Sequence, residues 1–584
     1  MILYDLAVKK EDQQETDRVT ANIRSTNISG PRRTFLKTAG LLTTLGFGGL
    51  ANAGTATAQR ADADDSRTFD SDVTIKGETN LKDTTYASDI NVRILRSEAI
   101  QGVAEHIIRK QSQLESLPND LEDGDTVLIG NVKHSEPINI DGVTNVTISG
   151  IGKEGSSITT ATGANCGLFH IGHNSAVGTI TIKNLMLDGN NENQPGGATT
   201  ANPIWTQNVD EIRCEDVFFK DSIVSRGSGG AGENTSCARV FYPTRKATFI
   251  DCDVDARCVR GIESSCEELH VMGGEFKNTY ERCISLDALV KTRRVTQRAC
   301  IDGVTVTKGE DGSDAGACVG GAGLRMQEVG DEGVTPTGDP IEEWVIENCF
   351  LGEEDISGKR TGITIREFSG NGALFKFRNN VIGDQNEQGI LCKHTAYSET
   401  ITEDAEIVSE GNRAVMSPGG AKAFAFGNAR RTTSRGDTAI GKGMSSNYSS
   451  EVTYTEFEVR NVPNSFSLAS NQSNDEFTAR SGEIYNSSST ALRVVTPGAT
   501  VSDVKFIGQH DNEDCIRIDG AANAEIRDCI FRGDPDNPGR HGILATGSET
   551  TDLMIVGNSS REGIAGNTLQ LYDGAATALE SANL

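Results

Sequence analysis

A short unit recurs from about residue 180 to the C-terminus, and it limits the folds open to this chain more than any other feature. The first half of each unit has an apolar pair around a polar position, then Asn, Asp or Gly with Cys, then a second apolar pair. ATFIDCDVD, WVIENCFLG and AEIRDCIFRG are examples. The second half is a small residue followed by apolar, variable and apolar residues, as in GIES and CIRIDG. The repeat is anchored on Ile182, Ile212, Ile250, Val271, Ile301, Ile346, Phe377, Ile407, Ala479, Val501 and Ile526.

Most steps between these anchors are about 20–40 residues, and no helical pattern separates the units. Such a period is typical of a solenoid in which each unit forms one coil. Side chains alternate between the two sides of a strand, so stacked coils would align the recurrent Ile, Val and Cys in an interior. We therefore predict an all-β fold, a single-stranded right-handed parallel β-helix of about 12 coils. The alternative of an immunoglobulin-like array would need hairpin turns, and few Asn-Gly or Asp-Gly pairs are present.

An amphipathic helix is predicted to precede the coils. Ile100, Val103 and Ile107 fall on one helical face, and Pro118 is expected to end the helix. This helix would cap the first coil and cover its unpaired edge. The predicted boundaries are a signal peptide over 1–58, a polar linker over 59–85, the β-helix over 86–572 with its capping helix at 97–116 and an insertion at 413–476, and a tail over 573–584.

The N-terminal segment carries an export pattern. Arg32 and Arg33 lie in PRRTFLK, ahead of an apolar stretch that is too short and too rich in Gly and Thr for a stable membrane span. Small-residue cleavage sites follow, ending at Ala53 and Ala58. The segment resembles the twin-arginine signals of secreted proteins. The resemblance implies the twin-arginine translocase as a partner during export, and an extracellular or cell-surface location.

The chain is strongly acidic, with 83 Asp and Glu against 55 Lys and Arg and a net charge of −28. Such a surface repels nucleic acid and anionic lipid, so nucleic acid is not an expected partner. The acidic coat is typical of proteins from high-salt organisms, and with the export signal it indicates a haloarchaeal type of protein.

The cysteines are predicted to be buried thiols in ladders rather than metal ligands. There are 13 of them and no CxxC pair. Cys252, Cys349 and Cys529 share one position of the repeat, whereas disulfides among Cys237, Cys258 and Cys266 stay open outside the cell. The remaining metal-like pattern, His170 and His173 in FHIGHN, is more often structural.

Stacking the second half-units brings charged residues together on one outward face. Neighbouring coils lie roughly 4.8 Å apart, and outward residues on one strand roughly 6.7 Å apart. The residues expected to crowd this face are Glu263, Asp287, Arg325, Arg366 and Lys393, with Arg260, Arg282, Glu367 and His394 at its rim. Cations gathered on an acidic protein suit an anionic sugar chain, and the alternative is a surface ladder of alternating charges that relieves its own repulsion.

Over roughly residues 86–572 the repeat resembles the pectin-lyase-like right-handed β-helix family. The resemblance implies a polysaccharide lyase acting on a uronate-containing polysaccharide. In such enzymes a basic residue removes the proton beside the carboxylate while a second cation or Ca²⁺ neutralises it. The candidates are Arg366, Lys393 and Arg325 for catalysis, Arg260, Arg282, His394 and Glu367 for substrate binding, and Asp287 and Glu263 for Ca²⁺.

Two other functions stay open. NEDCIRI at 512–518 and RHGI at 540–543 are similar to polygalacturonase motifs, which would make Glu513 and Asp514 the paired acids of a glycoside hydrolase beside His541. The chain departs from that family because no NTD motif lies one coil earlier and no RIK motif follows. A solenoid with polar faces can also be a non-catalytic adhesin or spike that binds a surface glycan.

Overall fold

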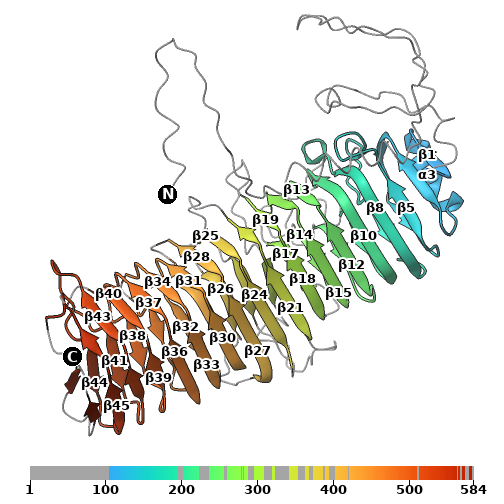
Figure 1. Cartoon of the computed structure of the whole chain (residues 1–584). Coiled ribbons are helices and arrows are strands. Elements are labelled where there is room, and N and C mark those ends of the chain that lie inside the picture. The colour runs from blue at the N-terminus through green and yellow to red at the C-terminus, as the bar shows by residue number, and fades with distance from the viewer. Residues whose placement is uncertain are drawn as a thin grey trace, which may run out of the picture. The chain divides into compact units, whose positions relative to one another are not determined.

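A computed structural model describes most of the chain after residue 103 (Figure 1). The described residues are 104–194, 202–222, 236–255, 260–277, 279, 282–286, 295–307, 319–322, 341–352, 362–366, 372–385, 388–393, 402–417, 420–463, 465–509, 512–561, 563–565, 569–571 and 578–581. The predicted signal peptide with Arg32 and Arg33 and the polar linker lie outside them.

The described chain is a parallel β-helix, as predicted. Each coil contributes three strands, and every strand pairs in parallel with its counterparts in the coils before and after, so the strands form three faces. The strands of the first face are β1 (His106–Ile108), β2 (Thr126–Ile129), β5 (Val146–Ser149), β8 (Val177–Asp188), β10 (Val209–Lys220), β12 (Lys246–Ile250), β15 (Glu268–Met272), β18 (Arg298–Asp302), β21 (Glu343–Glu347), β24 (Leu374–Arg378), β27 (Thr402–Glu410), β30 (Ala429–Arg435), β33 (Glu451–Thr455), β36 (Glu476–Arg480), β39 (Thr500–Ser502), β42 (Glu525–Arg527), β45 (Leu553–Val556) and β48 (Ala578–Ser581).

The second face continues the same 32-stranded sheet beyond a bend, and β8 and β10 run through that bend into it. Its other strands are β3 (Asn131–His134), β6 (Ser157–Thr160), β13 (Asp253–Asp255), β16 (Glu275–Lys277), β19 (Thr305–Val306), β22 (Phe350–Leu351), β25 (Val381–Gln385), β28 (Arg413–Met416), β31 (Thr438–Ile440), β34 (Glu458–Arg460), β37 (Glu483–Tyr485), β40 (Lys505–Gln509), β43 (Ile530–Gly533) and β46 (Ser559–Ser560).

The third face is a separate 16-stranded sheet. Its strands are β4 (Ile138–Ile140), β7 (Phe169–Ile171), β9 (Ile204–Thr206), β11 (Ser236–Val240), β14 (Arg260–Ser264), β17 (Arg282–Ser285), β20 (Val319–Ala322), β23 (Ile363–Arg366), β26 (Gln388–Lys393), β29 (Lys422–Gly427), β32 (Met444–Asn447), β35 (Leu468–Ala469), β38 (Leu492–Val494), β41 (Ile516–Asp519), β44 (Ile543–Thr546) and β47 (Leu569–Leu571).

The bend between the first and second faces explains the Asn, Asp or Gly of the sequence repeat. One residue there has a positive φ in coil after coil, which favours glycine and, among other residues, Asn and Asp. Asp251, Asn379 and Asp528 have φ values of 50°, 52° and 55°, and Gly303 has 67°. The bend therefore dictates the residue type that the repeat shows.

Ser481 occupies this bend with φ 54° and is exposed. A left-handed conformation costs a residue with a Cβ about 1–2 kcal/mol, and glycine avoids this cost. Glycine also loses more conformational entropy on folding, which cancels part of the gain. Ser481→Gly is therefore expected to raise the free energy of unfolding by about 0.5–1 kcal/mol, measured by guanidinium denaturation. Asn379→Gly is the matched control with a smaller expected gain, and equal effects of the two substitutions would contradict the argument.

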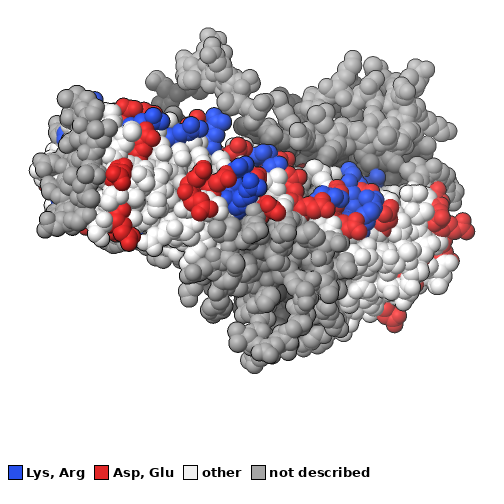
Figure 2. Space-filling model, turned by 90° about the horizontal axis from the view of Figure 1, so that it is seen from below, with Lys and Arg blue, Asp and Glu red and all other residues white. Residues whose placement is uncertain are grey.

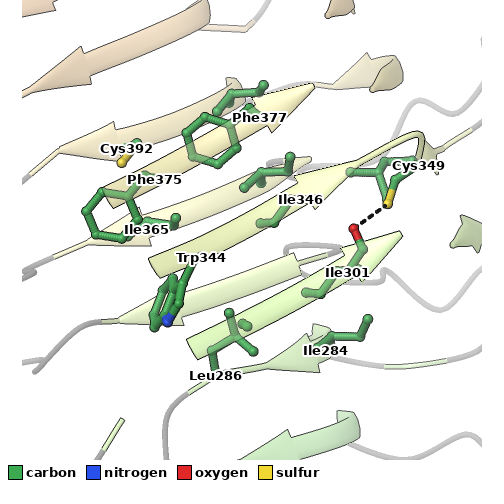
Figure 3. Close-up of a cluster of buried hydrophobic side chains, with 14 of the residues drawn as sticks. Ile284, Leu286, Ile301, Trp344, Ile346, Cys349, Ile365, Phe375, Phe377 and Cys392 are labelled. Atoms are coloured by element: carbon green, nitrogen blue, oxygen red, sulfur yellow. Dashed lines mark hydrogen bonds between the residues drawn. The ribbon is translucent and has the colours of Figure 1, made fainter. Parts of the chain in front are cut away.

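The core lies inside the three faces. Ile301, Ile346 and Phe377 occupy register-matched positions of β18, β21 and β24 and are fully buried (Figure 3). The thiol of Cys349 lies over the carbonyl oxygen of Ile301 at 3.8 Å (Figure 3). The predicted ladder thiols Cys252, Cys349 and Cys529 are all buried and unbridged, and none of the eleven cysteines that the structure describes forms a disulfide. Cys237 and Cys266 therefore form no disulfide, and Cys258 lies outside the described residues.

A polar ladder crosses the core at the position after the bend. Asn380 Oδ1 accepts from the Cys349 amide at 3.1 Å, and Asn412 Oδ1 accepts from the Asn380 amide at 3.0 Å. Asp437 Oδ1 in turn accepts from the Asn412 amide at 2.8 Å and from its Nδ2 at 3.0 Å. All three ladder side chains are fully buried. Each is satisfied by its neighbour, as buried polar groups require.

Asp437 ends this ladder with a carboxyl group whose pKa is raised by burial. A raised pKa means that its contribution to stability is present at low pH and is lost as pH rises through the pKa of the folded state. Asp437→Asn keeps the oxygen acceptor without the buried charge. We expect it to raise the free energy of unfolding at pH 7 by on the order of 1 kcal/mol, seen as a higher melting temperature. Below about pH 4 we expect no such effect. A gain that is the same at both pH values would contradict this prediction.

The predicted capping helix is in the wrong place. The observed helix α3 spans Gln111–Asp120 and contains Pro118, while Ile107 lies in strand β1. Residues 97–103 lie outside the described residues. Residues 106–108 are His, Ile and Ile, and the two β-branched isoleucines favour a strand, which pairs with β2. This pairing outweighs the helical spacing of Ile107 from Ile100 and Val103. Leu114 and Leu117 anchor α3 with exposed fractions of 0% and 1%.

The predicted insertion at 413–476 is also wrong, because this stretch folds as ordinary coils. Strands β28 to β36 pair in register with the coils on both sides. Their inward positions include Thr432, Ser434 and Tyr454, all fully buried, and the polar residue types hid the repeat. Among the described residues the third face has 16 strands, one from each coil it passes through, whereas about 12 coils were predicted. No helix in the described part of the chain is long and apolar enough to cross a bilayer.

Candidate functional site

The strands of the third face are rich in basic residues although the chain is acidic. Their sequences contain eight basic and two acidic residues, against 55 and 83 in the whole chain. The basic residues are Arg239, Arg260, Arg282, Arg366, Lys393, Lys422, Arg493 and Arg517, and the acidic residues are Glu263 and Asp519. We call these ten residues the basic face.

Basic residues on this face also neighbour one another across coils. The strand register places Arg260 beside Arg282, Arg366 beside Lys393, and Arg493 beside Arg517. Paired strands lie roughly 4.8 Å apart, so like charges directly opposite one another are destabilising unless an opposite charge compensates. An anion along this face would supply that compensation.

The first face shows the contrasting arrangement. Arg298 donates to Glu268 at 3.2 Å and to Glu342 at 3.1 Å, and Arg431 lies between Glu406 at 3.4 Å and Glu451 at 2.8 Å. Acidic and basic side chains likewise adjoin one another on the side of the molecule that Figure 2 shows. The ladder of alternating charges that was the alternative for the outward face therefore exists on the first face. The third face differs from it in holding eight basic but only two acidic residues in its strands.

One acidic residue of the basic face is entirely buried with its partners. Glu263 is 0% exposed, and it accepts from Arg239 Nε at 2.9 Å, Ser236 Oγ at 2.8 Å and Arg260 at 3.2 Å. The side chains of Arg239 and Arg260 are 5% and 2% exposed. Arg239 also lies over the ring of Phe241, with its guanidinium carbon 4.9 Å from the ring centre. This cluster is internal, so Arg260 is not the surface substrate-binding residue that the sequence predicted.

Glu263 does not fit a calcium site either. Both of its oxygens already accept from guanidinium groups, and a cation there would face two positive charges. Within the described residues, no three His, Cys, Asp or Glu side chains gather as a metal site would require. Asp287, the second predicted ligand, lies outside those residues.

The predicted catalytic residues are partly brought together. Arg366 and Lys393 occupy neighbouring register positions at the ends of β23 and β26, and Lys393 is half-buried. The register of β20 puts Gly320 beside Thr364 and Ala322 beside Arg366, whereas the prediction had put Arg325 beside Thr364. The Gly-rich sequence VGGAG fits the repeat pattern in more than one register, and the predicted register differed from the observed one by five residues. Arg325, Glu367 and His394 lie outside the described residues.

Arg282, the other predicted rim residue, is half-buried and donates to Ser285 Oγ at 3.0 Å. Near the C-terminal end of the face, Arg493 pairs with Asp519 at 3.0 Å and lies 5.4 Å over the ring of Phe466. These arginines keep partly exposed guanidinium groups, since the side chain of Arg493 is 39% exposed.

The structure does not support the paired acids of the hydrolase alternative. Asp514 is fully buried and forms a two-point ion pair with Arg540, at 2.6 and 3.0 Å. Glu513 accepts from Thr490 Oγ1 at 3.1 Å. Burial lowers the pKa of the neighbouring His541, as does Arg540, while Asp514 opposes them. A carboxylate held by an arginine in this way is a structural partner rather than an acid that could protonate a leaving group.

A buried cysteine–histidine pair elsewhere is not a nucleophile. Cys166 Sγ lies 3.8 Å from His134 Nδ1. Burial raises the pKa of the thiol to about 11 and lowers the pKa of the imidazole to about 4, so at neutral pH the thiol stays protonated and the neutral imidazole is too weak a base to activate it.

Sequence reasoning missed Lys422 and Arg239 as members of the basic face. Lys422 donates to the Phe466 carbonyl at 3.4 Å, and burial together with the charge of Lys442 lowers its pKa. It was missed because its strand fell inside the supposed insertion. Arg239 lies in SCARV, where Cys237, Ala238, Arg239 and Val240 fit the second half-unit, so the repeat itself could have found it.

No protein-family model matches the sequence, and no curated protein does. Among solved structures, the catalytic unit of a GH87 α-1,3-glucanase from Streptomyces thermodiastaticus is 13% identical, with a TM-score of 0.30 over 81% of this chain and 67% of that one. The A-module of the mannuronan C-5 epimerase AlgE4 from Azotobacter vinelandii is 12% identical, with a TM-score of 0.22 over 80% and 96%. Likeness at this level says nothing about substrate or chemistry.

Proposed function

We propose that this chain is an exported carbohydrate-active protein that binds a uronate-containing polysaccharide along the basic face and cleaves it as a lyase. One observation carries the proposal: the strands of the third face hold eight basic and two acidic residues, with Arg366 beside Lys393 and Arg493 beside Arg517 in neighbouring coils, on a chain with a net charge of −28. A polymer with a carboxylate on successive residues would neutralise such a row, and guanidinium groups bind carboxylates with two hydrogen bonds.

The lyase step assigns different roles to the two basic residues in register. Arg366 would neutralise the uronate carboxylate, since a guanidinium group stays protonated at any relevant pH. Lys393, in its neutral form, would accept the proton from the carbon beside that carboxylate. The electron pair of the broken C–H bond forms the new double bond, the glycosidic C–O bond breaks, and the leaving oxygen takes a proton from water.

The export signal over 1–58 and the acidic composition support an extracellular protein of haloarchaeal type that uses the twin-arginine translocase. Calcium assistance is a weaker part of the proposal, because Glu263 is committed to two arginines. We therefore expect the activity to survive chelation of calcium.

The test is to incubate the purified mature chain in KCl with oligogalacturonate, alginate and neutral polysaccharides. A new ultraviolet absorbance from unsaturated uronate supports elimination. New reducing ends without that absorbance would favour the hydrolase alternative and overturn the lyase assignment. Binding without cleavage of any polymer would leave the third alternative, a non-catalytic adhesin or spike.

A further inference from the structure

The N-terminal end of the third face carries aromatic rings in place of cations. His170 of β7 and Trp205 of β9 are register neighbours, and His173 follows three residues after His170. The two imidazole rings stack with their centres 5.0 Å apart, and both stand edge-on to the indole, at 5.3 and 4.6 Å. Trp205 is only partly buried, although it belongs to a strand whose other residues are fully buried core. We call these three residues the aromatic cluster.

Polar atoms without partners surround the aromatic cluster. Trp205 Nε1, His170 Nε2, Asn202 Nδ2 and Asn165 Oδ1 are all buried, and none has a hydrogen-bond partner among the described residues. Buried polar atoms are normally paired, and unpaired ones that gather in one place call for an explanation. His173 differs, because its Nε2 hydrogen-bonds to the Trp205 carbonyl at 3.2 Å.

The aromatic cluster carries no charge at neutral pH. Burial lowers the pKa of His170 to about 4, and burial also lowers the pKa of His173. The next residue along the same column is Arg239, the first basic residue of the basic face. The third face thus begins with an uncharged aromatic patch and continues with cations.

We propose that the aromatic cluster is a binding subsite for a neutral pyranose ring of the same polysaccharide. A sugar ring offers an apolar C–H side that stacks on the partly exposed indole of Trp205. This inference rests on the proposed function and extends it, because it makes the substrate a polymer that contains neutral residues as well as uronates.

Two alternative occupants fit less well. A uronate would find no cation in the aromatic cluster itself. For a metal ion, His170 Nε2 is an unpaired ring nitrogen in the aromatic cluster. The described part of the chain places no group of three His, Cys, Asp or Glu side chains there, as a metal site would require.

Tryptophan fluorescence tests the subsite directly, because the chain has only two tryptophans. Trp344 is fully buried in the core and donates to the Thr296 carbonyl at 2.8 Å, so a ligand on the surface leaves its emission unchanged. Neutral oligosaccharides of glucose, galactose or mannose are expected to shift the emission of Trp205 in a saturable manner that is independent of salt. Trp205→Ala should lower their affinity at least about ten-fold by calorimetry, and Trp205→Phe should lower it less.

The readouts separate this subsite from the proposed function. Trp205 lies five coils from Arg366, roughly 24 Å along the helix, so a short neutral oligosaccharide cannot reach both. Arg366→Gln should therefore leave the binding of neutral sugars unchanged. The inference is overturned if no neutral sugar produces a fluorescence or calorimetric signal while oligogalacturonate binds. It is also overturned if the emission responds only to Ni²⁺ or Zn²⁺, reversibly with EDTA and not in His170→Ala.

Discussion

Glu263→Ala is expected to lower the free energy of unfolding by about 3–5 kcal/mol, one of the largest effects of any single substitution in this chain. The glutamate is 0% exposed and accepts from Arg239, Arg260 and Ser236. Its removal takes a buried counter-charge away from two guanidinium groups, whose side chains are 5% and 2% exposed. Burying an unpaired charge costs far more than losing a surface ion pair.

The matched control is Glu406→Ala, which removes the partner of Arg431 on the first face. That pair is 3.4 Å long, and its side chains are 42% and 46% exposed, so its loss is expected to cost less than about 1 kcal/mol. Guanidinium denaturation of both variants at one KCl concentration gives the comparison. If the two variants lose equal stability, the buried cluster is not the constraint that its geometry indicates.

A second variant separates charge from packing. In Arg239→Met with Glu263→Met, both members of the shortest ion pair of the cluster are replaced by apolar side chains of similar length. Replacing a buried ion pair as a unit is often neutral, so this variant should recover part of the stability that Glu263→Ala loses. A double variant as unstable as Glu263→Ala would contradict this expectation, because it would show that the charge left on Arg239 does not account for the loss of stability.

The coil could be predicted from the sequence where the inward residues are apolar and the bend residue is Asn, Asp or Gly. Ile301, Ile346 and Phe377 were placed in their true register for this reason, although the anchor Ile250 was one residue out of register because Phe249 lies beside Val271. The prediction failed at Thr432, Ser434 and Tyr454, because buried hydroxyl groups look like surface residues in a sequence. It also failed at 106–108, where helical spacing and strand pairing compete and only tertiary pairing decides.

The site was predictable to the extent that register was. Arg366 and Lys393 were correctly aligned because each ends an apolar-variable-apolar unit, GITIR and ILCK. Arg325 was misplaced because glycines leave the register of its unit undetermined. Burial could not be predicted at all: Glu263 and Asp514 have the pattern of outward residues, and yet arginines from neighbouring positions enclose them. Whether an outward acid is free or paired depends on side chains that lie far from it in the sequence.

Arg366→Gln combined with Lys393→Gln is expected to abolish the proposed lyase activity and to weaken the binding of oligogalacturonate by at least about 100-fold at low salt. A hydrogen bond to a charged group contributes roughly 1.5–3 kcal/mol, so two such contacts reach that factor. Lys393→Gln alone should lower kcat/KM by about 10²–10⁴, the usual contribution of a general base. Initial rates of unsaturated uronate formation and calorimetric affinities measure the two effects separately.

Arg431→Gln is the control of matching chemistry, because Arg431 is held between Glu406 and Glu451 and faces no like charge on the neighbouring strands. Its substitution should change neither rate nor affinity. Salt distinguishes the two roles of the paired cations: at about 1 M salt the screening length falls to roughly 3 Å, so long-range attraction disappears while direct contacts persist. If the double variant binds like the unmodified protein in high KCl, the Arg366–Lys393 pair contributes only long-range attraction. The lyase assignment then fails, because proton removal needs direct contact between Lys393 and the sugar.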